Sequence, residues 1–274
     1  MTVPNILTIA GLDPSGGAGL LADVKTFSAL GAYGCGAVTA LTVQNTVGVT
    51  GISPVAASFV KEELDTLFDD VRIDAVKIGM IADAEIMRVV ADRLEKYRPP
   101  YIVIDPVMVA KSGDALMAPE AVGVFREVMM PLATVLTPNI PEAAVLLGRM
   151  PWESAGRCEE EAFALQAMLK RGAWVLLKGG HLKGGESPDF LTNGRLLERF
   201  DAKRVATKNT HGTGCTLSSA VAALLPRTKD VPSAVRGAKD YIENAIAHAD
   251  ELEVGRGHGP VHHFEALWRG MTFA

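Results

Sequence analysis

The chain has 274 residues, of which 48% are hydrophobic and 22% are charged, and its formal net charge is −5. These proportions are those of an ordinary globular protein, and the length is sufficient for a full hydrophobic core. The lysines and arginines are scattered along the chain, which argues against nucleic acid as a partner. No apolar run reaches the length of a membrane span, so we expect no membrane partner.

Short β-rich runs alternate with helical runs along the chain. We predict strands at residues 5–10, 36–44, 46–52, 74–79, 101–105, 134–137, 173–178, 188–192 and 195–200. We predict helices at residues 20–30, 55–68, 83–97, 119–130, 141–147, 159–170, 216–225 and 231–250. This alternation predicts an α/β fold with a central, mostly parallel sheet and helices on both faces, within one domain of residues 1–274. Residues 108–117 form a predicted loop, which is either a mobile flap or a plain surface loop.

The three cysteines, Cys35, Cys158 and Cys215, lie far apart and include no C-x-x-C pair. This is not the spacing of a secreted disulfide framework, so we expect a reducing, cytoplasmic setting. The first residues, M-T-V-P-N, lack the basic segment and long apolar stretch of a signal peptide, which agrees with that expectation.

Two glycine-rich segments follow predicted strands. The first, L-D-P-S-G-G-A-G at residues 12–19, has neither the G-x-G-x-x-G spacing of a dinucleotide site nor the G-K-[ST] ending of a P-loop. The second, N-T-H-G-T-G-C-T-L-S-S at residues 209–219, places Gly212 and Gly214 directly before a predicted helix. Glycine lets the backbone approach a ligand closely, and a helix start offers unpaired N–H groups and a positive dipole end.

The second segment therefore predicts a cradle for phosphate. Cys215 falls on the first turn of the helix, where we expect the pKa of its thiol to be lowered. The alternative interpretation is a glycine-rich helix cap beside a buried cysteine.

Polar residues gather at or just past the ends of the predicted strands, at the edge where parallel sheets bind ligands. Asp105, Asn139 and Glu142 offer oxygen atoms, and the last two lie three residues apart at a predicted helix start. Oxygen ligands suit Mg²⁺, which proteins hold through few carboxylates together with water and substrate phosphates. Lys178 offers a positive charge for a phosphate. With the cradle, these residues indicate phosphoryl transfer without a Walker motif.

Each of these residues also has a structural interpretation. Glu142 suits the N-terminal end of a helix dipole, and Asp105 suits a turn before proline. Lys178 could extend its charge to solvent. The placement of the whole set at one edge of the sheet favours the functional interpretation.

Other residues also have both a functional and a structural interpretation. Gln44 could bond to backbone at a strand end, Met80 could fill the core, and His211 could be a satisfied loop histidine. His262 and His263 have no cysteine or acidic partner at metal-ligand spacing, so we interpret them as structural.

Nine segments of the chain carry recognisable motifs. They are A-G-x-D-P-S-G-G-A-G at 10–19, A-D-x-K-T at 22–26, T-V-Q-N-T at 42–46, V-K-I-G-M at 76–80, D-P-V-M-V at 105–109, T-P-N-x-P-E-A at 137–143, V-L-L-K-G-G-H at 175–181, N-T-H-G-T-G-C-T-L-S-S-A at 209–220 and G-P-V-H-H-F at 259–264. In these segments the chain resembles the ribokinase superfamily, specifically the bacterial hydroxymethylpyrimidine and phosphomethylpyrimidine kinases of thiamine biosynthesis. The resemblance spans nearly the whole chain. It implies a homodimeric ribokinase-like enzyme that uses ATP and Mg²⁺ to phosphorylate 4-amino-5-hydroxymethyl-2-methylpyrimidine and then its monophosphate.

The resemblance also implies roles for individual residues. Gln44 would bind the aminopyrimidine edge, whose donor and acceptor pattern a carboxamide can match. The residues implied to frame the ring are Gly11, Ala18, Asp23, Met80 and Val107. Those implied to serve Mg²⁺ and phosphate are Asp105 and Glu142, as metal ligands, and Asn139. Those implied to contact the nucleotide and the transferred phosphoryl group are Lys178, Thr210, Gly212, Thr213, Gly214 and Cys215.

The chain departs from the wider superfamily at Cys215, where sugar kinases of this type usually carry Asp as the general base. A thiolate would take the proton of the alcohol here, helped by the helix start. We hypothesise that the exchange serves two successive phosphorylations. The monophosphate already carries charge and needs no base, and a fixed carboxylate would repel it, whereas a thiol can stay neutral.

Three other functions compete with this interpretation. A pyridoxal or pyridoxine kinase of the same superfamily is the nearest, but Gln44 and Met80 favour the pyrimidine. A non-catalytic pyrimidine-sensing module is opposed by the filled phosphoryl-transfer positions and by the lack of an appended DNA-binding domain. A nicotinamide-dependent oxidoreductase lacks both the glycine fingerprint and an acid after the second strand.

Overall fold

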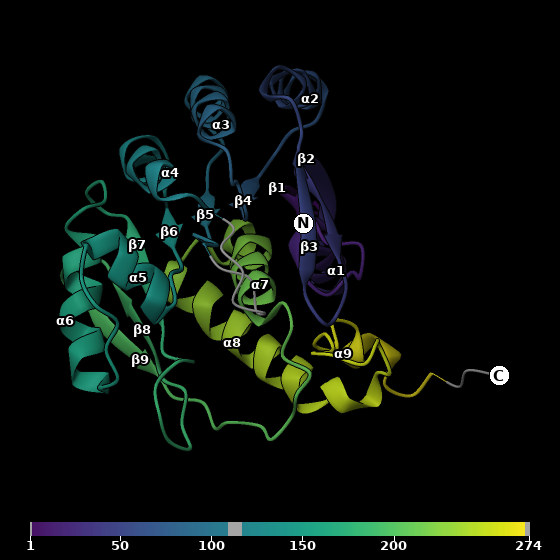
Figure 1. Cartoon of the computed structure of the whole chain (residues 1–274), viewed down its shortest axis with the longest axis vertical. Coiled ribbons are helices and arrows are strands. Elements are labelled where there is room, and N and C mark those ends of the chain that lie inside the picture. The colour runs from purple at the N-terminus through teal and green to yellow at the C-terminus, as the bar shows by residue number, and fades with distance from the viewer. Residues whose placement is uncertain (1, 109–116, 272–274) are drawn as a thin grey trace.

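A single nine-stranded sheet runs through the computed structural model, which describes residues 2–108 and 117–271 (Figure 1). Its strand order is β3-β2-β1-β4-β5-β6-β7-β8-β9. The strands are β1 Asn5–Leu12, β2 Tyr33–Gln44, β3 Val49–Pro54, β4 Ala75–Ile78, β5 Ile102–Ile104, β6 Val135–Leu136, β7 Trp174–Lys178, β8 Asp189–Thr192 and β9 Leu197–Phe200. The pairings from β2 to β7 are parallel, whereas β3 at one edge and β8 and β9 at the other pair antiparallel. The prediction of a mostly parallel sheet is confirmed.

Helices cover both faces of the sheet, also as predicted (Figure 1). The helices are α1 Gly19–Ala29, α2 Ala57–Asp70, α3 Ala84–Tyr97, α4 Pro119–Val124, α5 Ile140–Leu147, α6 Ala155–Gln166, α7 Thr213–Thr228, α8 Val231–Ala247 and α9 Glu265–Trp268. One buried cluster joins the sheet to α2 through α6, and the other joins it to α1, α7 and α8. Strand side chains alternate between the two clusters, so that Val76 and Ile78 of β4 enter the first and Ala75 the second.

Local hydrogen bonds explain where the elements begin and end. Helix α3 begins at Ala84 because Asp83 Oδ1 accepts from the backbone N–H groups of Glu85 at 2.8 Å and Ile86 at 3.0 Å. Helix α6 begins earlier than predicted because the Ser154 hydroxyl caps it by accepting from Arg157 N at 3.3 Å. The antiparallel edge strand β3 begins later than predicted because Asn45 Oδ1 accepts from Val47 N at 2.8 Å and shapes a turn.

Two helical regions differ from the predictions, and one predicted loop lies mainly outside the described residues. The single helix predicted at 119–130 is α4 followed by a π-helix, η1 Phe125–Met129, and a 3₁₀ turn, η2 Met130–Leu132. A second 3₁₀ turn, η3 Ala249–Glu251, ends the α8 segment, and the short α9 was not predicted. The predicted flap falls mainly on residues 109–116, outside the described residues. Within the described part of the chain, no helix has the length and hydrophobicity needed to cross a bilayer.

Candidate active site

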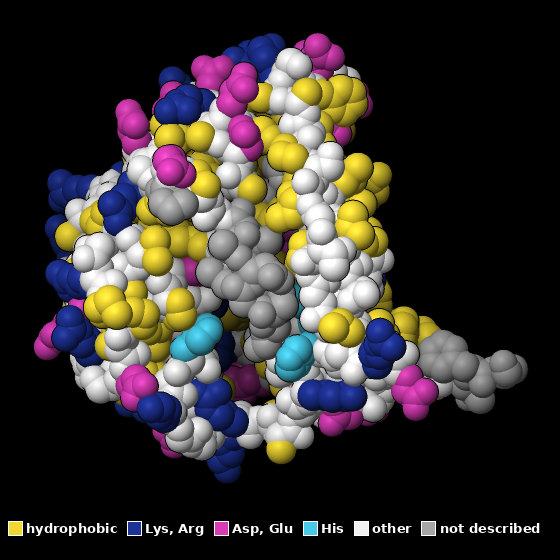
Figure 2. Space-filling view, in the orientation of Figure 1, with side chains coloured by type: hydrophobic (Ala, Val, Ile, Leu, Met, Phe, Trp, Pro, Cys, Tyr) yellow, Lys and Arg dark blue, Asp and Glu magenta, His cyan; other side chains and the backbone are white. Residues whose placement is uncertain are grey.

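The carboxyl ends of the parallel strands open into a cavity of about 1220 Å³, on a face that is visibly hollowed (Figure 2). All the predicted site residues except Asp23 line this cavity. Those that line it are Gly11, Ala18, Gln44, Met80, Asp105, Val107, Asn139, Glu142, Lys178, Thr210, Gly212, Thr213, Gly214 and Cys215. The structure therefore gathers residues that are spread over two hundred positions of sequence into one space, as the strand-end argument predicted.

The predicted phosphate cradle lies where the 209–219 segment turns into α7. Gly212 caps the helix with φ of +74°, a left-handed conformation that strongly favours glycine. A Cβ atom at Gly212 would lie 1.8 Å from the carbonyl oxygen of Gly17, so the two glycine-rich segments pack directly against each other. The N-terminal amides of a 16-residue helix then point toward the cavity end, where they suit an anion.

Cys215 lies on the first turn of α7 and is half-buried. Burial raises the pKa of its thiol to about 11, and the nearby carboxylates of Asp23 and Asp105 act in the same direction. The ammonium group of Lys77 and the backbone N–H of Gly19 oppose that rise without cancelling it. The prediction of a lowered thiol pKa is therefore wrong, because desolvation outweighs the helix start. The neutral thiol at neutral pH does agree with the hypothesis that this position avoids a fixed negative charge.

Asp105 and Lys178 form an ion pair at the bottom of the cavity. Lys178 Nζ lies 2.7 Å from Asp105 Oδ1, and the Thr137 hydroxyl donates to the same oxygen at 3.1 Å. Asp105 Oδ2 accepts from the Ser218 hydroxyl at 3.3 Å, which ties the end of β5 to α7. Burial alone would lower the pKa of Lys178, but Asp105 and Glu142 outweigh it and raise the pKa. Lys178 is thus a protonated ammonium group held at the edge of the sheet.

Glu142 lies at the start of α5, as its structural interpretation anticipated, and also lines the cavity. It forms a capping box with Asn139: Asn139 Oδ1 accepts from Glu142 N at 2.9 Å, and Glu142 Oε2 accepts from Asn139 N at 2.8 Å. Burial raises the pKa of Glu142 to about 7, with Lys178 opposing the rise and Asp105 adding to it. The residue is a helix cap and also a buried acid that faces the cavity.

The raised pKa of Glu142 predicts a pH-dependent cost to stability. The folded protein binds the proton of Glu142 more tightly than the unfolded chain does. The stability that this group contributes is therefore fully present below about pH 4.5 and is lost as pH rises through about 7. Glu142→Gln keeps the capping box but removes the charge, so the variant should gain about 2 kcal/mol in unfolding free energy at about pH 8 and little at about pH 5. Urea denaturation at both pH values measures this difference. The exposed Glu85, changed to Gln, is the control, and an equal gain at both pH values would contradict the prediction.

Asp105 and Glu142 fit a cation whose remaining ligands are water and the phosphates of a bound substrate. Among the described residues, no group of three or more histidine, cysteine or acidic side chains could hold a metal ion by itself. Asp105 and Glu142 are both close enough to Lys178 to shift its pKa, and both line the cavity. Two carboxylates are what proteins offer Mg²⁺ when water and substrate phosphates complete its shell.

Asp23 is the one predicted site residue that lies elsewhere. Its side chain is 0% exposed and is absent from the cavity wall, so it cannot frame a bound ring there. It forms an ion pair with Lys77 and accepts hydrogen bonds from Thr8 and Ser219. The prediction failed because sequence shows that Asp23 follows the glycine-rich segment but not which way helix α1 turns it.

Sequence reasoning missed several residues of this site. Asp13 lines the cavity, and its Oδ2 lies 2.7 Å from His211 Nε2, so His211 is a paired histidine within the cavity wall. Lys239 and Asp189 also line the cavity and form a buried pair at 2.9 Å. Asp13 could have been found from its place directly after β1, whereas Lys239 lies within a long helix and carries no signal in the sequence.

Comparisons with known proteins identify the family. The sequence matches the family described as phosphomethylpyrimidine kinase over residues 13–262. The chain belongs to this family. The hydroxymethylpyrimidine/phosphomethylpyrimidine kinase of Escherichia coli strain K12 is 52% identical over 264 residues, which cover 96% of this chain and 98% of that protein.

Two solved structures show the same architecture. An ADP complex of Bacillus subtilis pyridoxal kinase superposes with a TM-score of 0.88 and 35% identity, over 97% of this chain and 99% of that one. The phosphomethylpyrimidine kinase of Clostridium difficile 630 superposes with a TM-score of 0.78 and 39% identity, over 89% of this chain and 99% of that one. This family member is thus a phosphotransferase with the ribokinase-like fold.

Proposed function

We propose that this kinase transfers the terminal phosphoryl group of ATP to 4-amino-5-hydroxymethyl-2-methylpyrimidine and then, in a second round, to the monophosphate. The observation that supports this most directly is one cavity that holds both a carboxamide for the pyrimidine, Gln44, and a helix-start cradle for phosphate beside Cys215. The family match and the names of its relatives agree with this substrate. One continuous sheet contains every strand of the site, so we also propose that residues 1–274 work as a single kinase domain.

The substrate end of the cavity lies where β1, β2 and β4 finish. The Thr42 hydroxyl lies 3.1 Å from Gln44 Oε1, which places the carboxamide at the end of β2 with its amino group available to the ring. A Cβ atom at Gly11 would lie 2.4 Å from Cε of Met80, so glycine there makes room for the methionine beside the ring. Ala18 and Val107 complete the proposed frame.

The nucleotide end lies at Asn139, Lys178 and the cradle. We assign the phosphates of ATP to these groups because the ammonium group and the α7 amides concentrate positive charge there. Asp105 and Glu142 would hold Mg²⁺, which would neutralise phosphate charge when bound. The related pyridoxal kinase was solved with ADP, which supports nucleotide binding by this fold.

In the first round, Cys215 acts as the general base in its thiolate form. The thiolate takes the proton of the hydroxymethyl group, and the alcohol oxygen forms a bond to the terminal phosphorus. The bond from that phosphorus to the bridging oxygen breaks, and its electron pair leaves with ADP. In the second round the attacking oxygen belongs to a phosphate that is already charged, so no proton needs to be removed.

Product analysis tests the function. The purified protein is incubated with ATP, Mg²⁺ and the pyrimidine alcohol, and phosphorus NMR should show the monophosphate first and the diphosphate later. Pyridoxal and pyridoxine are the comparison substrates, because a pyridoxal kinase shares the fold. Faster turnover of the vitamin B6 alcohols than of the pyrimidine would contradict the proposal.

We propose that the protein is a homodimer joined through the β2–β3 ribbon. Leu41 and Val43 lie two apart on β2, so they share one face of it, and they are 51% and 66% exposed. The Val43→Glu variant should dissociate into monomers that wild-type protein does not show in sedimentation velocity. Met150→Glu, at a position 82% exposed outside the ribbon, is the control. A wild-type monomer at all concentrations would contradict this.

The three cysteines are unpaired, which is consistent with a cytoplasmic location.

A further inference from the structure

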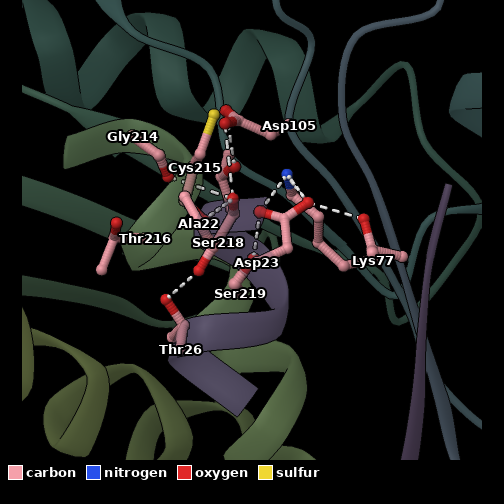
Figure 3. A network of polar contacts seen from close by, with 12 residues as sticks. Ala22, Asp23, Thr26, Lys77, Asp105, Gly214, Cys215, Thr216, Ser218 and Ser219 are labelled. Carbon is pink, nitrogen blue, oxygen red and sulfur yellow. Dashed lines mark hydrogen bonds and ion pairs between the residues drawn. The ribbon is translucent and has the colours of Figure 1, made fainter. Parts of the chain in front are cut away.

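A buried ion pair lies next to the cradle, and the proposed chemistry uses neither of its members. Lys77 Nζ lies 2.9 Å from both carboxylate oxygens of Asp23, and both side chains are 0% exposed (Figure 3). Removing two charges from water is unfavourable, and apolar residues of similar size often serve stability as well or better. A charged pair at this position therefore needs an explanation beyond packing.

The sequence V-K-I-G-M places the ammonium group on the α7 face of the sheet. Val76 and Ile78 face the α2 and α3 side, so the alternation of a strand directs Lys77 to the other face. Lys77 is in register with Thr8 of β1, which shares its acidic partner. A Cβ atom at Gly79 would lie 2.8 Å from Lys77 Nζ, so this glycine makes room for the charge.

Asp23 connects the ammonium group to the catalytic end of α7. Its Oδ1 accepts from the Ser219 hydroxyl at 2.7 Å. Ser219 follows Cys215 by four residues, so the two side chains share one face of the helix. Figure 3 shows Asp23 between Lys77 and α7. Cys215 lines the cavity, whereas neither Lys77 nor Asp23 does, so the pair lies behind the thiol as seen from the substrate.

We propose that Lys77 is a positioning residue for the first phosphorylation: held by Asp23, its ammonium group supplies a fixed positive charge behind the cradle that acts through Cys215. This inference rests on the proposed role of Cys215 as the base.

Four charged groups act on the thiol. They are Lys77 from β4, Asp23 from α1, Asp105 after β5 and Lys178 from β7. Burial and the two acids raise the pKa of the thiol, and Lys77 opposes them. Lys77 has the largest effect among the groups that lower the thiol pKa, and it lies on the side of Cys215 away from the cavity, whereas Lys178 lines the cavity.

The test removes both charges while keeping the shape of the pair. The double variant Lys77→Met with Asp23→Asn leaves no lone buried charge, so it should fold. We expect kcat for the alcohol to fall about tenfold, because Lys77 acts on the thiol more strongly than Asp23, while KM for both substrates changes less than about threefold. For the monophosphate, kcat should fall less than about twofold, because that round needs no base. Equal losses in both rounds would overturn the proposal and indicate a purely structural pair.

A second readout is independent of substrate. Alkylation of Cys215 by iodoacetamide, followed by mass spectrometry, should slow about tenfold in the double variant relative to Cys35, a half-buried cysteine of β2 in the same molecule. An unchanged ratio of Cys215 to Cys35 alkylation would overturn the proposal, whichever alcohol the wild type phosphorylates. If the wild type turned over no pyrimidine but the ratio still fell, the proposed function would fail and the charge effect would stand.

Ser219→Ala is the matched control. It removes the hydrogen bond to Asp23 but leaves both charges in place, so the alkylation ratio and most of the kcat for the alcohol should be retained. A loss as large as that of the double variant would show that the contact with α7, and not the charge, matters, and this would also overturn the proposal.

Discussion

The Cys215→Ala variant is expected to lose about 10³-fold in kcat/KM for the pyrimidine alcohol and no more than about tenfold for the monophosphate. The alcohol must give up a proton during transfer, and the monophosphate oxygen has none to give up. Initial rates with each substrate, followed by separation of the mono- and diphosphate, measure both losses. Equal losses in the two rounds would reject the assignment of Cys215 as a base.

The pH dependence of the same rates provides a second check on Cys215. With its pKa raised to about 11, the thiol is neutral at neutral pH, and the thiolate fraction grows as pH rises. In the wild type, kcat/KM for the alcohol should therefore rise about tenfold per pH unit between about pH 7 and 10, and the Ala variant should show no such rise. Cys35→Ala is the control for general effects of losing a thiol.

The Cys215→Asp variant should impair the second round selectively, since its carboxylate would repel the incoming phosphate.

The Gly212→Ala variant is expected to lose about 10²- to 10³-fold in kcat for both rounds, because the cradle serves both. At Gly212 the backbone has φ of +74°, and an added Cβ would meet the carbonyl oxygen of Gly17 at 1.8 Å. Alanine must therefore push the two glycine-rich segments apart and tilt the amides of α7 away from the phosphate. Steady-state kinetics with each substrate measure the loss.

The control for this variant is a helical glycine with open space around it. Gly156 lies in α6, and a Cβ atom there would meet nothing within 4 Å. Gly156→Ala should leave both rounds of phosphorylation unchanged and should stabilise the helix by up to about 1 kcal/mol. If the Gly212 variant kept normal rates in both rounds, the cradle would have no part in transfer.

Much of the fold and of the cavity lining could be predicted because these features are local. The alternation of strands and helices indicates a parallel sheet, and the ends of such strands meet at one edge. Residues at or just past the end of a strand, such as Lys178 and Asp105, were therefore placed in one cavity without any knowledge of their contacts. The predicted start of the helix at 83–97 was equally local, because the capping side chain of Asp83 bonds to the backbone two and three residues away.

What could not be predicted depends on burial and on pairs distant in sequence. Asp23 and Lys77 are 54 residues apart, and nothing in either segment reveals the other. The pKa of Cys215 was predicted in the wrong direction because a helix start can be read from glycines, whereas desolvation depends on everything packed around the thiol. The change from α4 to a π-helix at Phe125–Met129 also carries no clear signal in composition.

The contact between Asp13 and His211 bridges 198 positions of the chain. Such contacts must wait until distant segments have been brought together, and the entropy of closing that loop opposes them. We therefore expect catalytic competence to emerge late during refolding, after the sheet and most helices have formed, since proteins rich in long-range contacts gain them slowly. A nascent polypeptide still lacking its final quarter would, by the same reasoning, carry the residues assigned to the pyrimidine but not the α7 amides assigned to the transferred phosphate.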